Sequence, residues 1–214
     1  MFIFFQVKEN SCYFSFDLRT CYWNSKRQNE RKRFIGSIES NSKILDLFSG
    51  VGPLAISLRK HKKCQIICND LNIHACEYIA KNCQQNQLPY EVVDSISKIR
   101  FSKKIQIFNI DAQLMLEKIY IDVFDHIIID FPPQAWKFVK LVETRLLNSI
   151  NCRTTTTPII CHFYCFGPQE NWENYFQQNY ISSFSKNMQF EFIKINNVEA
   201  GKALFYSKMY LIRS

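Results

Sequence analysis

Acidic side chains follow four apolar runs of the chain, at the point where each run ends. Asp46, Asp70, Asp111 and Asp130 occupy these positions. In a parallel sheet the carboxyl ends of the strands meet at one edge, and open α/β sheets bind their ligands at that edge. We therefore expect the four carboxylates to line one binding site. Each could instead cap the helix that follows its strand.

A glycine-containing turn gives the clearest local signal. The segment DLFSGVGP, residues 46–53, follows one apolar run and opens a helical pattern. Gly50 and Gly52 allow a sharp turn and a close approach of the backbone to a ligand. The third glycine of a dinucleotide-binding fingerprint is missing, and the carboxylate of Asp46 suits a cationic ligand end better than a pyrophosphate. We expect this turn, including Phe48, to bind a ligand that carries positive charge.

The ends of the next two strands carry residues that could bind the ribose and the base of a nucleoside. Asp70, followed by Leu71, lies about 20 residues after the glycine turn, where an acidic side chain typically accepts hydrogen bonds from both hydroxyls of a ribose. The third run ends in Asn-Ile-Asp-Ala, where the carboxylate of Asp111 or the backbone amide of Ala112 can read an adenine edge. The pattern favours an adenosine-containing cofactor.

The fourth run ends in Asp-Phe-Pro-Pro, residues 130–133. Prolines such as Pro132 rigidify a loop, and a side-chain acceptor beside them can hold a planar, flipped-out base. A simple strand-ending turn is the structural alternative. Trp136 and Phe138 follow at helical spacing, which favours core positions over stacking surfaces.

The apolar runs alternate with helical patterns, which predicts βαβ units and a doubly wound α/β fold with a mostly parallel sheet. A short N-terminal hairpin, a charged helix and a final antiparallel hairpin flank these units. We expect one domain, residues 41–214, preceded by a lead-in, residues 1–40. The predicted strands are 2–7, 11–18, 43–48, 64–69, 105–110, 126–130, 158–166, 189–196 and 203–212, and the predicted helices are 24–40, 53–60, 72–86, 112–119, 134–150 and 168–179.

Composition favours an anionic partner. The 214 residues carry a formal net charge of +8, and basic residues cluster in segments 26–33, 59–63 and 98–104. Phosphate neutralisation dominates nucleic-acid binding, so three such clusters favour a nucleic acid. The apolar start MFIFFQ is soon interrupted by charge and predicts a strand rather than a signal peptide, so we expect an intracellular protein. Nine cysteines show no metal-ligand spacing; we expect free buried thiols and no metal site.

Residues 14–31 resemble a signature of the archaeal and eukaryotic tRNA (guanine-N1)-methyltransferases that act on position 37. That signature is a hydrophobic-Phe-Asp segment, then Val-Tyr-Trp-Asn-Ser-Arg-Leu, then Thr-Glu-His; here FSFD, CYWNSKR and NER stand in the same order. DLFSGVGP, NDLN, NIDA, DFPP and VEAGK continue the match downstream. The resemblance implies a Rossmann-like class I methyltransferase that uses S-adenosylmethionine to methylate N1 of guanosine 37 in tRNA.

The resemblance also implies roles at the base. Glu30 matches the glutamate proposed as general base for the N1 proton. Lys26 stands at the position of an arginine that stabilises charge on the base oxygen, and keeps the charge without the bidentate fork. Tyr22 matches a tyrosine near the target base. Asp130 matches an asparagine and so changes a neutral amide into a carboxylate.

Further matches concern the cofactor. Arg31 stands at the position of a histidine beside it, and Asp70 with Leu71 and Asp111 with Ala112 match cofactor-binding pairs. Family members carry additional N-terminal domains that grip the tRNA body, and the signature begins close to the start of this sequence. We therefore expect the catalytic domain to recognise the anticodon stem-loop alone or with a protein partner.

Three alternatives stay open. The wybutosine-pathway transferase that moves an aminocarboxypropyl group has the same sheet and a similar glutamate block. A methyltransferase acting on another RNA or a protein nitrogen would also use the DFPP turn. A non-catalytic tRNA-binding subunit would retain the fold without the activity.

Overall fold

The computed structural model describes residues 4–149 and 158–211. The chain forms two units, Met1–Lys118 and Ile119–Ser214. We call them the N-terminal unit and the C-terminal unit and describe each by itself. The predicted division at residue 40 stays a prediction.

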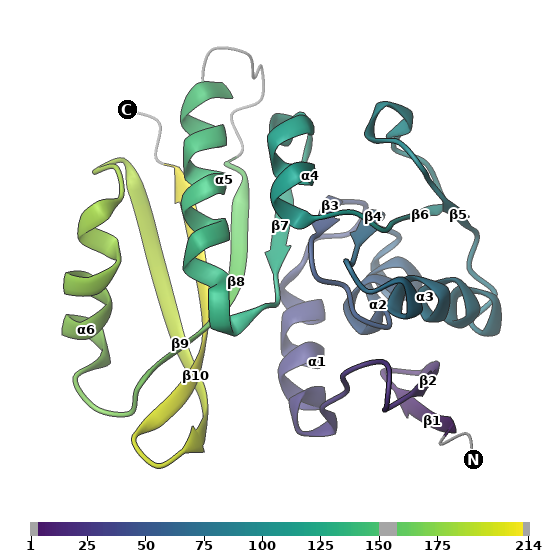
Figure 1. Cartoon of the computed structure of the whole chain (residues 1–214), viewed down its shortest axis with the longest axis horizontal. Coiled ribbons are helices and arrows are strands. Elements are labelled where there is room, and N and C mark those ends of the chain that lie inside the picture. The colour runs from purple at the N-terminus through teal and green to yellow at the C-terminus, as the bar shows by residue number, and fades with distance from the viewer. Residues whose placement is uncertain (1–3, 150–157, 212–214) are drawn as a thin grey trace. The chain divides into compact units, whose positions relative to one another are not determined.

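The N-terminal unit contains four parallel strands in the order β5-β6-β4-β3. Apolar side chains fill these strands almost without interruption, as expected for strands that are covered on both faces; β6, for example, is buried at every position. The strands are β3 (Lys43–Asp46), β4 (Gln65–Asn69), β5 (Tyr90–Val92) and β6 (Ile105–Phe108), and the helices between and after them are α2 (Pro53–Lys62), α3 (Ile73–Gln85) and α4 (Ala112–Lys118), with a 3-10 turn η2 (Ile96–Lys98) (Figure 1).

A two-stranded antiparallel hairpin precedes this sheet. It consists of β1 (Phe4–Glu9) and β2 (Cys12–Asp17), with Glu9 opposite Cys12. The side chains of Cys12, Phe14 and Phe16 are fully buried, so one face of β2 belongs to the core of the unit. A 3-10 turn η1 (Ser25–Arg27) and helix α1 (Gln28–Ser37) follow the hairpin.

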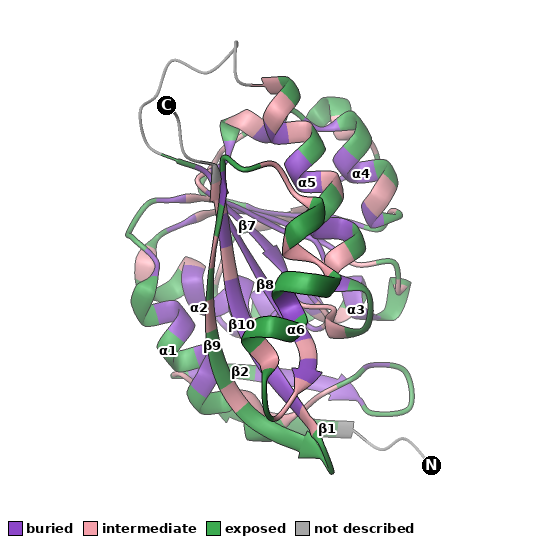
Figure 2. Ribbon diagram, turned by 90° about the vertical axis from the view of Figure 1, so that its left-hand side faces the viewer, coloured by how far each residue is buried: buried purple, intermediate pink, exposed green. Residues whose placement is uncertain are grey.

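The C-terminal unit combines parallel and antiparallel pairing. Strand β7 (His126–Ile129) lies parallel to β8 (Ile160–Pro168), whereas β10 (Lys202–Leu211) lies antiparallel to both β8 and β9 (Met188–Glu199). The exposed positions gather along β9, and the buried ones along β7 and β8 (Figure 2). Helices α5 (Ala135–Ser149) and α6 (Trp172–Asn179) complete the unit, with 3-10 turns η3 (Ile121–Val123), η4 (Pro132–Gln134) and η5 (Ile181–Ser183).

An aromatic cluster forms the core between α5, α6 and the antiparallel strands. The ring of Trp136 stacks on Tyr180 at a centroid distance of 4.4 Å and meets the edge of Phe163 at 5.0 Å. Trp136 is half-buried within this cluster, and Phe138 is buried. Both side chains therefore belong to the core, as their helical spacing predicts.

The predicted fold class is confirmed: strands alternate with helices, the pairing is mostly parallel, and the chain ends in an antiparallel hairpin. Strand β5 was not predicted, because three residues are too few to show a periodicity. The predicted charged helix 24–40 is shorter and is preceded by a separate 3-10 turn. The predicted ends at residues 2, 3, 150 and 212 lie outside the described residues.

The cysteines behave as small apolar side chains. The eight that the structure describes are all buried and free, and burial raises the pKa of Cys76 to about 11 and that of Cys83 to about 12. The prediction of free buried thiols is confirmed for these eight; Cys152 lies outside the described residues. Within residues 4–149 and 158–211, no helix is long and apolar enough to cross a bilayer, and no cluster of His, Cys, Asp and Glu suits a metal ion.

Gly167 on β8 provides a test of the aromatic packing. A Cβ atom at this position would lie 2.5 Å from the ring of Phe176 and 3.1 Å from that of Phe205. We expect Gly167→Ala to lower the free energy of unfolding by about 1–3 kcal/mol, because the rings must shift. Urea denaturation measures this change.

Gly36 in α1 is the matched control, because a Cβ there meets nothing within 4 Å. Gly36→Ala should raise stability by up to about 1 kcal/mol through helix propensity. Equal effects of the two substitutions would contradict the packing described for β8.

Candidate functional site

The turn after β3 has the backbone conformation that its glycines allow. Gly50 and Gly52 have φ angles of +53° and +86°, in the left-handed region where a side chain is strained. A Cβ on Gly52 would meet Ile56 at 3.2 Å, whereas one on Gly50 would meet nothing within 4 Å. The turn therefore presents bare backbone to open space at Gly50, four residues after the buried Asp46.

Asp70 connects this turn to the end of β4. Its Oδ2 accepts a hydrogen bond from the Gly50 amide at 2.8 Å, and its Oδ1 accepts one from the Asn72 amide at 2.9 Å. Burial raises the pKa of the Asp70 carboxyl, and these two hydrogen bonds oppose the rise. Each oxygen has a further lone pair, so the carboxylate can still accept hydroxyl groups. The neighbouring Leu71 is 69% exposed and offers an apolar surface.

Two asparagines hold the strand ends in register. The buried side chain of Asn69 donates to the carbonyl of Leu47 at 3.3 Å and to that of Ile110 at 2.9 Å, and accepts from the Ile110 amide. The amide of Asn109 donates to the carbonyls of Asp70 and Leu71, both at 2.9 Å. The ends of β3, β4 and β6 are thus joined by side chains whose bracing role sequence reasoning missed.

Asp111 caps the helix that follows its strand, which is the alternative to ligand binding that the sequence analysis gave for each strand-end carboxylate. Its exposed carboxylate accepts a hydrogen bond from the Leu114 amide at 3.0 Å and so caps the first turn of α4. Ala112 is buried directly behind it. A cap of this kind leaves the second carboxylate oxygen for other donors, and the predicted contact with adenine stays a prediction.

The turn around η1 presents two of the predicted base-site side chains to solvent. The side chain of Asn24 accepts a hydrogen bond from the Lys26 amide at 3.0 Å and donates to the hydroxyl of Tyr22 at 3.2 Å. Tyr22 is 77% exposed, and Lys26 is exposed as well. One short turn therefore holds an aromatic ring and a cation where both can reach a ligand.

Arg31 joins this turn to the N-terminal hairpin. Its guanidinium donates to the Glu9 carboxylate at 2.6 and 2.5 Å and to the carbonyl of Asn24 at 3.2 Å, and it lies 4.8 Å from the ring centre of Trp23. Both members of the ion pair are buried. The pair positions the turn around η1 relative to β1. The sequence analysis did not predict this role for Glu9. The predicted contact of Arg31 with a cofactor stays a prediction.

Glu30 is buried on α1 and paired one turn further along the helix. Its two carboxylate oxygens accept hydrogen bonds from Arg33 at 2.7 and 2.6 Å. This bidentate contact fixes the orientation of the carboxylate.

Helix α3 braces both the hairpin and the glycine turn. The buried side chain of Asn82 accepts from the Ser15 amide at 2.7 Å and donates to the carbonyl of Val51 at 3.1 Å. One turn later, Asn86 bonds both the amide and the carbonyl of Tyr13, at 2.9 and 2.6 Å. These side chains replace the partner strand that β2 lacks on this edge. Two asparagines four residues apart on the buried face of an amphipathic helix were the signal for this role.

Asp130 and Pro132 belong to the C-terminal unit. Asp130 follows β7 and is half-buried, and the prolines after it open the 3-10 turn η4, in which the Gln134 amide donates to the carbonyl of Phe131 at 3.2 Å. The turn is therefore short and rigid, as its composition predicts. Its participation in one site with the residues of the N-terminal unit stays a prediction.

Comparison with known proteins identifies the family to which the chain is similar. Residues 6–169 match the family described as the TRM5/TYW2 methyltransferase domain. The chain is 30% identical over 163 residues to a tRNA (guanine(37)-N(1))-methyltransferase of Dictyostelium discoideum, covering 71% of this chain and 33% of the relative. It is 28% identical to tRNA (guanine(37)-N(1))-methyltransferase 1 of Vitis vinifera over 97% of its own length and 33% of the relative. The chain thus spans about a third of the length of these curated relatives.

Solved structures share the fold. Trm5b from Pyrococcus abyssi superposes with a TM-score of 0.74 at 20% identity, covering 99% of this chain and 57% of that chain. TYW2 of M. jannaschii, solved in complex with AdoMet, gives a TM-score of 0.70 at 18% identity, covering 100% of this chain and 88% of that chain.

The brace from α3 yields a prediction. Asn82→Ala leaves the Ser15 amide and the Val51 carbonyl without their side-chain partner, so we expect a loss of about 2–3 kcal/mol in the free energy of unfolding. Amide hydrogen exchange should also accelerate at Ser15. Gln84→Ala, on the exposed side of the same helix, is the control and should change stability by less than about 0.5 kcal/mol. Unaltered exchange at Ser15 in the Asn82 variant would refute the brace.

Proposed function

The chain belongs to the TRM5/TYW2 methyltransferase domain family, and we propose on this basis that it transfers a methyl group from S-adenosylmethionine to N1 of guanosine 37 in tRNA. The observation that carries the proposal is the turn bearing Tyr22 and Lys26 next to Glu30, in the same unit as the glycine turn. The names of the curated relatives support the choice of base.

The residues at the strand ends fit the cofactor. The open space at Gly50 leaves room for a ligand against the backbone, the Asp70 carboxylate can accept ribose hydroxyls, and exposed Leu71 can contact an adenine ring. The rest of the proposed cofactor-binding set in the N-terminal unit is Arg31, Asp46, Phe48, Gly52, Asp111 and Ala112, and the proposed members from the C-terminal unit are Asp130 and Pro132. When bound, S-adenosylmethionine supplies an electrophilic methyl group on a sulfonium.

The chain's own residues would position and deprotonate the base. N1 of guanine carries a proton that must leave, and the oriented carboxylate of Glu30 is its proposed acceptor. Lys26 supplies positive charge for the base oxygen as electron density moves onto it. The exposed ring of Tyr22 offers a surface for the flipped-out base, and Asp130 offers an acceptor for its exocyclic amine.

The proposal includes a tRNA partner and an intracellular location. A structural relative described as the complex of aTrm5 and tRNALeu superposes with a TM-score of 0.67, which supports tRNA as the ligand. The anticodon stem-loop is the part of the tRNA that we propose is bound. A protein partner that grips the rest of the tRNA is part of the same proposal.

A second candidate activity is aminocarboxypropyl transfer from the same cofactor, because the family also includes TYW2. The two activities differ in the mass added to the nucleoside. The glycine turn and the Tyr-Trp-Asn-Ser segment favour methyl transfer.

The test is incubation with S-adenosylmethionine and an unmodified tRNA transcript, followed by nucleoside mass spectrometry. We expect 1-methylguanosine at position 37 from a transcript with guanosine there, and no product from one with adenosine. An adduct with the mass of an aminocarboxypropyl group would establish the second candidate. Methylation at another position or base would contradict the proposal.

Glu30→Gln tests the proton acceptor. We expect kcat to fall by at least about 100-fold, because an amide cannot take the N1 proton. The affinity for S-adenosylmethionine should stay within about twofold of wild type, which corresponds to a difference in binding free energy of less than about 0.5 kcal/mol. Single-turnover kinetics and calorimetry measure the two quantities. Glu39→Gln, at an exposed position after α1, is the control and should turn over normally. Near-normal turnover of Glu30→Gln would remove this residue from the mechanism.

A further inference from the structure

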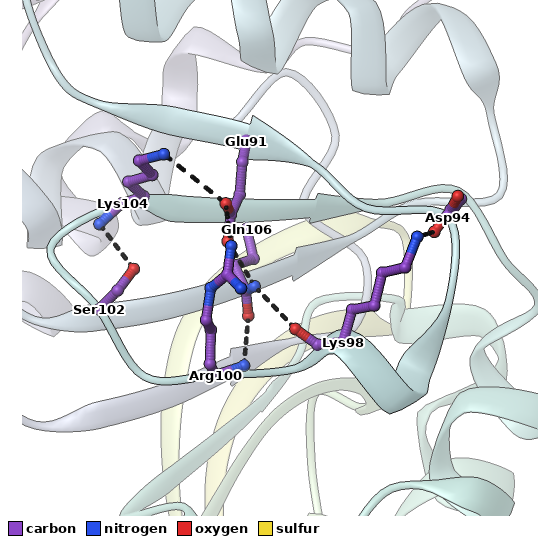
Figure 3. Close-up of polar contacts among 7 residues, drawn as sticks. All are labelled: Glu91, Asp94, Lys98, Arg100, Ser102, Lys104 and Gln106. Atoms are coloured by element: carbon purple, nitrogen blue, oxygen red, sulfur yellow. Dashed lines mark hydrogen bonds and ion pairs between the residues drawn. The ribbon is translucent and has the colours of Figure 1, made fainter.

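A cavity of about 390 Å³ opens at the carboxyl ends of β5 and β6. Its volume falls within the range of small-molecule sites and exceeds what a single phosphate group needs. Figure 3 shows polar contacts among residues of β5, β6 and the loop between them, and Ser102 and Lys104 in this group lie outside the lining of the cavity. The cavity is lined by Glu91, Val92, Val93, Asp94, Lys98, Arg100, Gln106, Asn109 and Ile110.

A buried glutamine fixes the loop that forms one wall. Gln106 on β6 donates to the Glu91 carboxylate at 2.6 Å and to the carbonyl of Lys98 at 3.4 Å, and accepts from the Arg100 amide at 3.1 Å. The residue itself is 1% exposed. The loop is therefore attached to the sheet through one side chain, and its cationic residues are presented from a fixed backbone.

The cations of this loop outnumber its acids. Arg100 and Lys104 share the same Glu91 oxygen, at 3.1 and 3.8 Å, while Lys98 pairs with Asp94 at 2.7 Å. The Gln106 hydrogen bond and the two cations lower the pKa of Glu91, so it stays ionised at neutral pH. The side chains of Arg100 and Lys104 are 69% and 53% exposed. One carboxylate thus pairs with two cations, both of which are largely exposed.

Part of the lining is apolar. Val92 is 69% exposed although it lies within a strand, and Ile110 and the buried Val93 also line the cavity. Asn109, which also lines the cavity, is the residue that bonds the carbonyls of Asp70 and Leu71. The cavity therefore adjoins the strand ends of the proposed cofactor site, without including the residues assigned to that site.

We propose that this cavity binds a nucleotide of the substrate RNA, with its sugar and base against Val92 and Ile110. Its phosphate would lie on Arg100, which lines the cavity, and on Lys104, which lies beside the lining with its ammonium 3.8 Å from the Glu91 carboxylate. The inference rests on the proposed function, because it assumes an RNA substrate. Two acids and two cations line the cavity, and Lys104 beside them makes the charge of the group positive. A cation excess next to the exposed side chain of Val92 matches a nucleotide unit, which joins an anionic phosphate to a largely apolar ring system. The bidentate guanidinium suits a phosphate in particular.

The test is tRNA binding at several salt concentrations for Arg100→Gln, Lys104→Gln and the double variant, with an unmodified transcript that carries guanosine 37. Each lost phosphate contact should reduce the slope of log affinity against log salt by about 0.7–1. We expect the double variant to bind tRNA about tenfold more weakly at physiological salt and to bind S-adenosylmethionine as wild type does. Lys118→Gln, at the far end of α4, is the matched control and should retain both affinities.

The outcomes separate this inference from the proposed function. If wild type binds and methylates the transcript and the double variant binds it equally well, with the same salt slope, the cavity does not contact RNA and the inference is overturned. If wild type neither binds nor methylates the transcript, the proposed function fails and the inference fails with it. Inorganic phosphate can also be titrated into both proteins. If phosphate binds to wild type but not to the double variant, while both bind tRNA equally well, the cavity binds a free anion and the inference is overturned. Unchanged thermal unfolding midpoints establish that the variants are folded.

Discussion

The bracing of backbone ends by buried amide side chains is the interaction on which the rest of the N-terminal unit depends. Strand ends and tight turns carry backbone groups without ladder partners, and leaving such groups buried and unpaired costs free energy. Asn69 satisfies these groups across three strand ends, and Asn82 satisfies them between the hairpin and the glycine turn. The proposed cofactor and base residues of the N-terminal unit are consequently held in place by these hydrogen bonds before any ligand arrives.

The charged side chains of the N-terminal unit fall into two groups, those that stabilise the fold and those that can bind a ligand. The buried pair of Arg31 and Glu9 is satisfied internally and fixes the turn in which Tyr22 stands. The cations of the Lys98–Lys104 loop are exposed and share too few carboxylates. This difference in burial, rather than the number of basic residues, separates the charges that maintain the fold from those that can meet an anionic substrate.

The fold was largely predictable because apolar runs and helical patterns alternate at lengths that only βαβ units satisfy, and the strand-end carboxylates follow from that alternation. Strand β5 has three residues, which are too few to show a strand periodicity in the sequence. The pairing of Glu9 with Arg31 could not be predicted either, because the two residues are far apart in the sequence and only the folded hairpin brings them together. The capping by Asp111 was foreseen as an alternative, yet no sequence pattern decides between a cap and a ligand contact. The participation of Asp130 in one site with residues of the N-terminal unit also stays a prediction.

The measurement that tests the central claim most directly is calorimetric titration of S-adenosylmethionine into wild type and Asp70→Asn. If the braced strand ends form a nucleoside site, wild type binds at one site, and the variant binds about tenfold more weakly or worse, because hydrogen bonds to a charged acceptor are lost. Absence of both heat and a thermal shift in wild type, or equal affinity of the two proteins, would contradict the account.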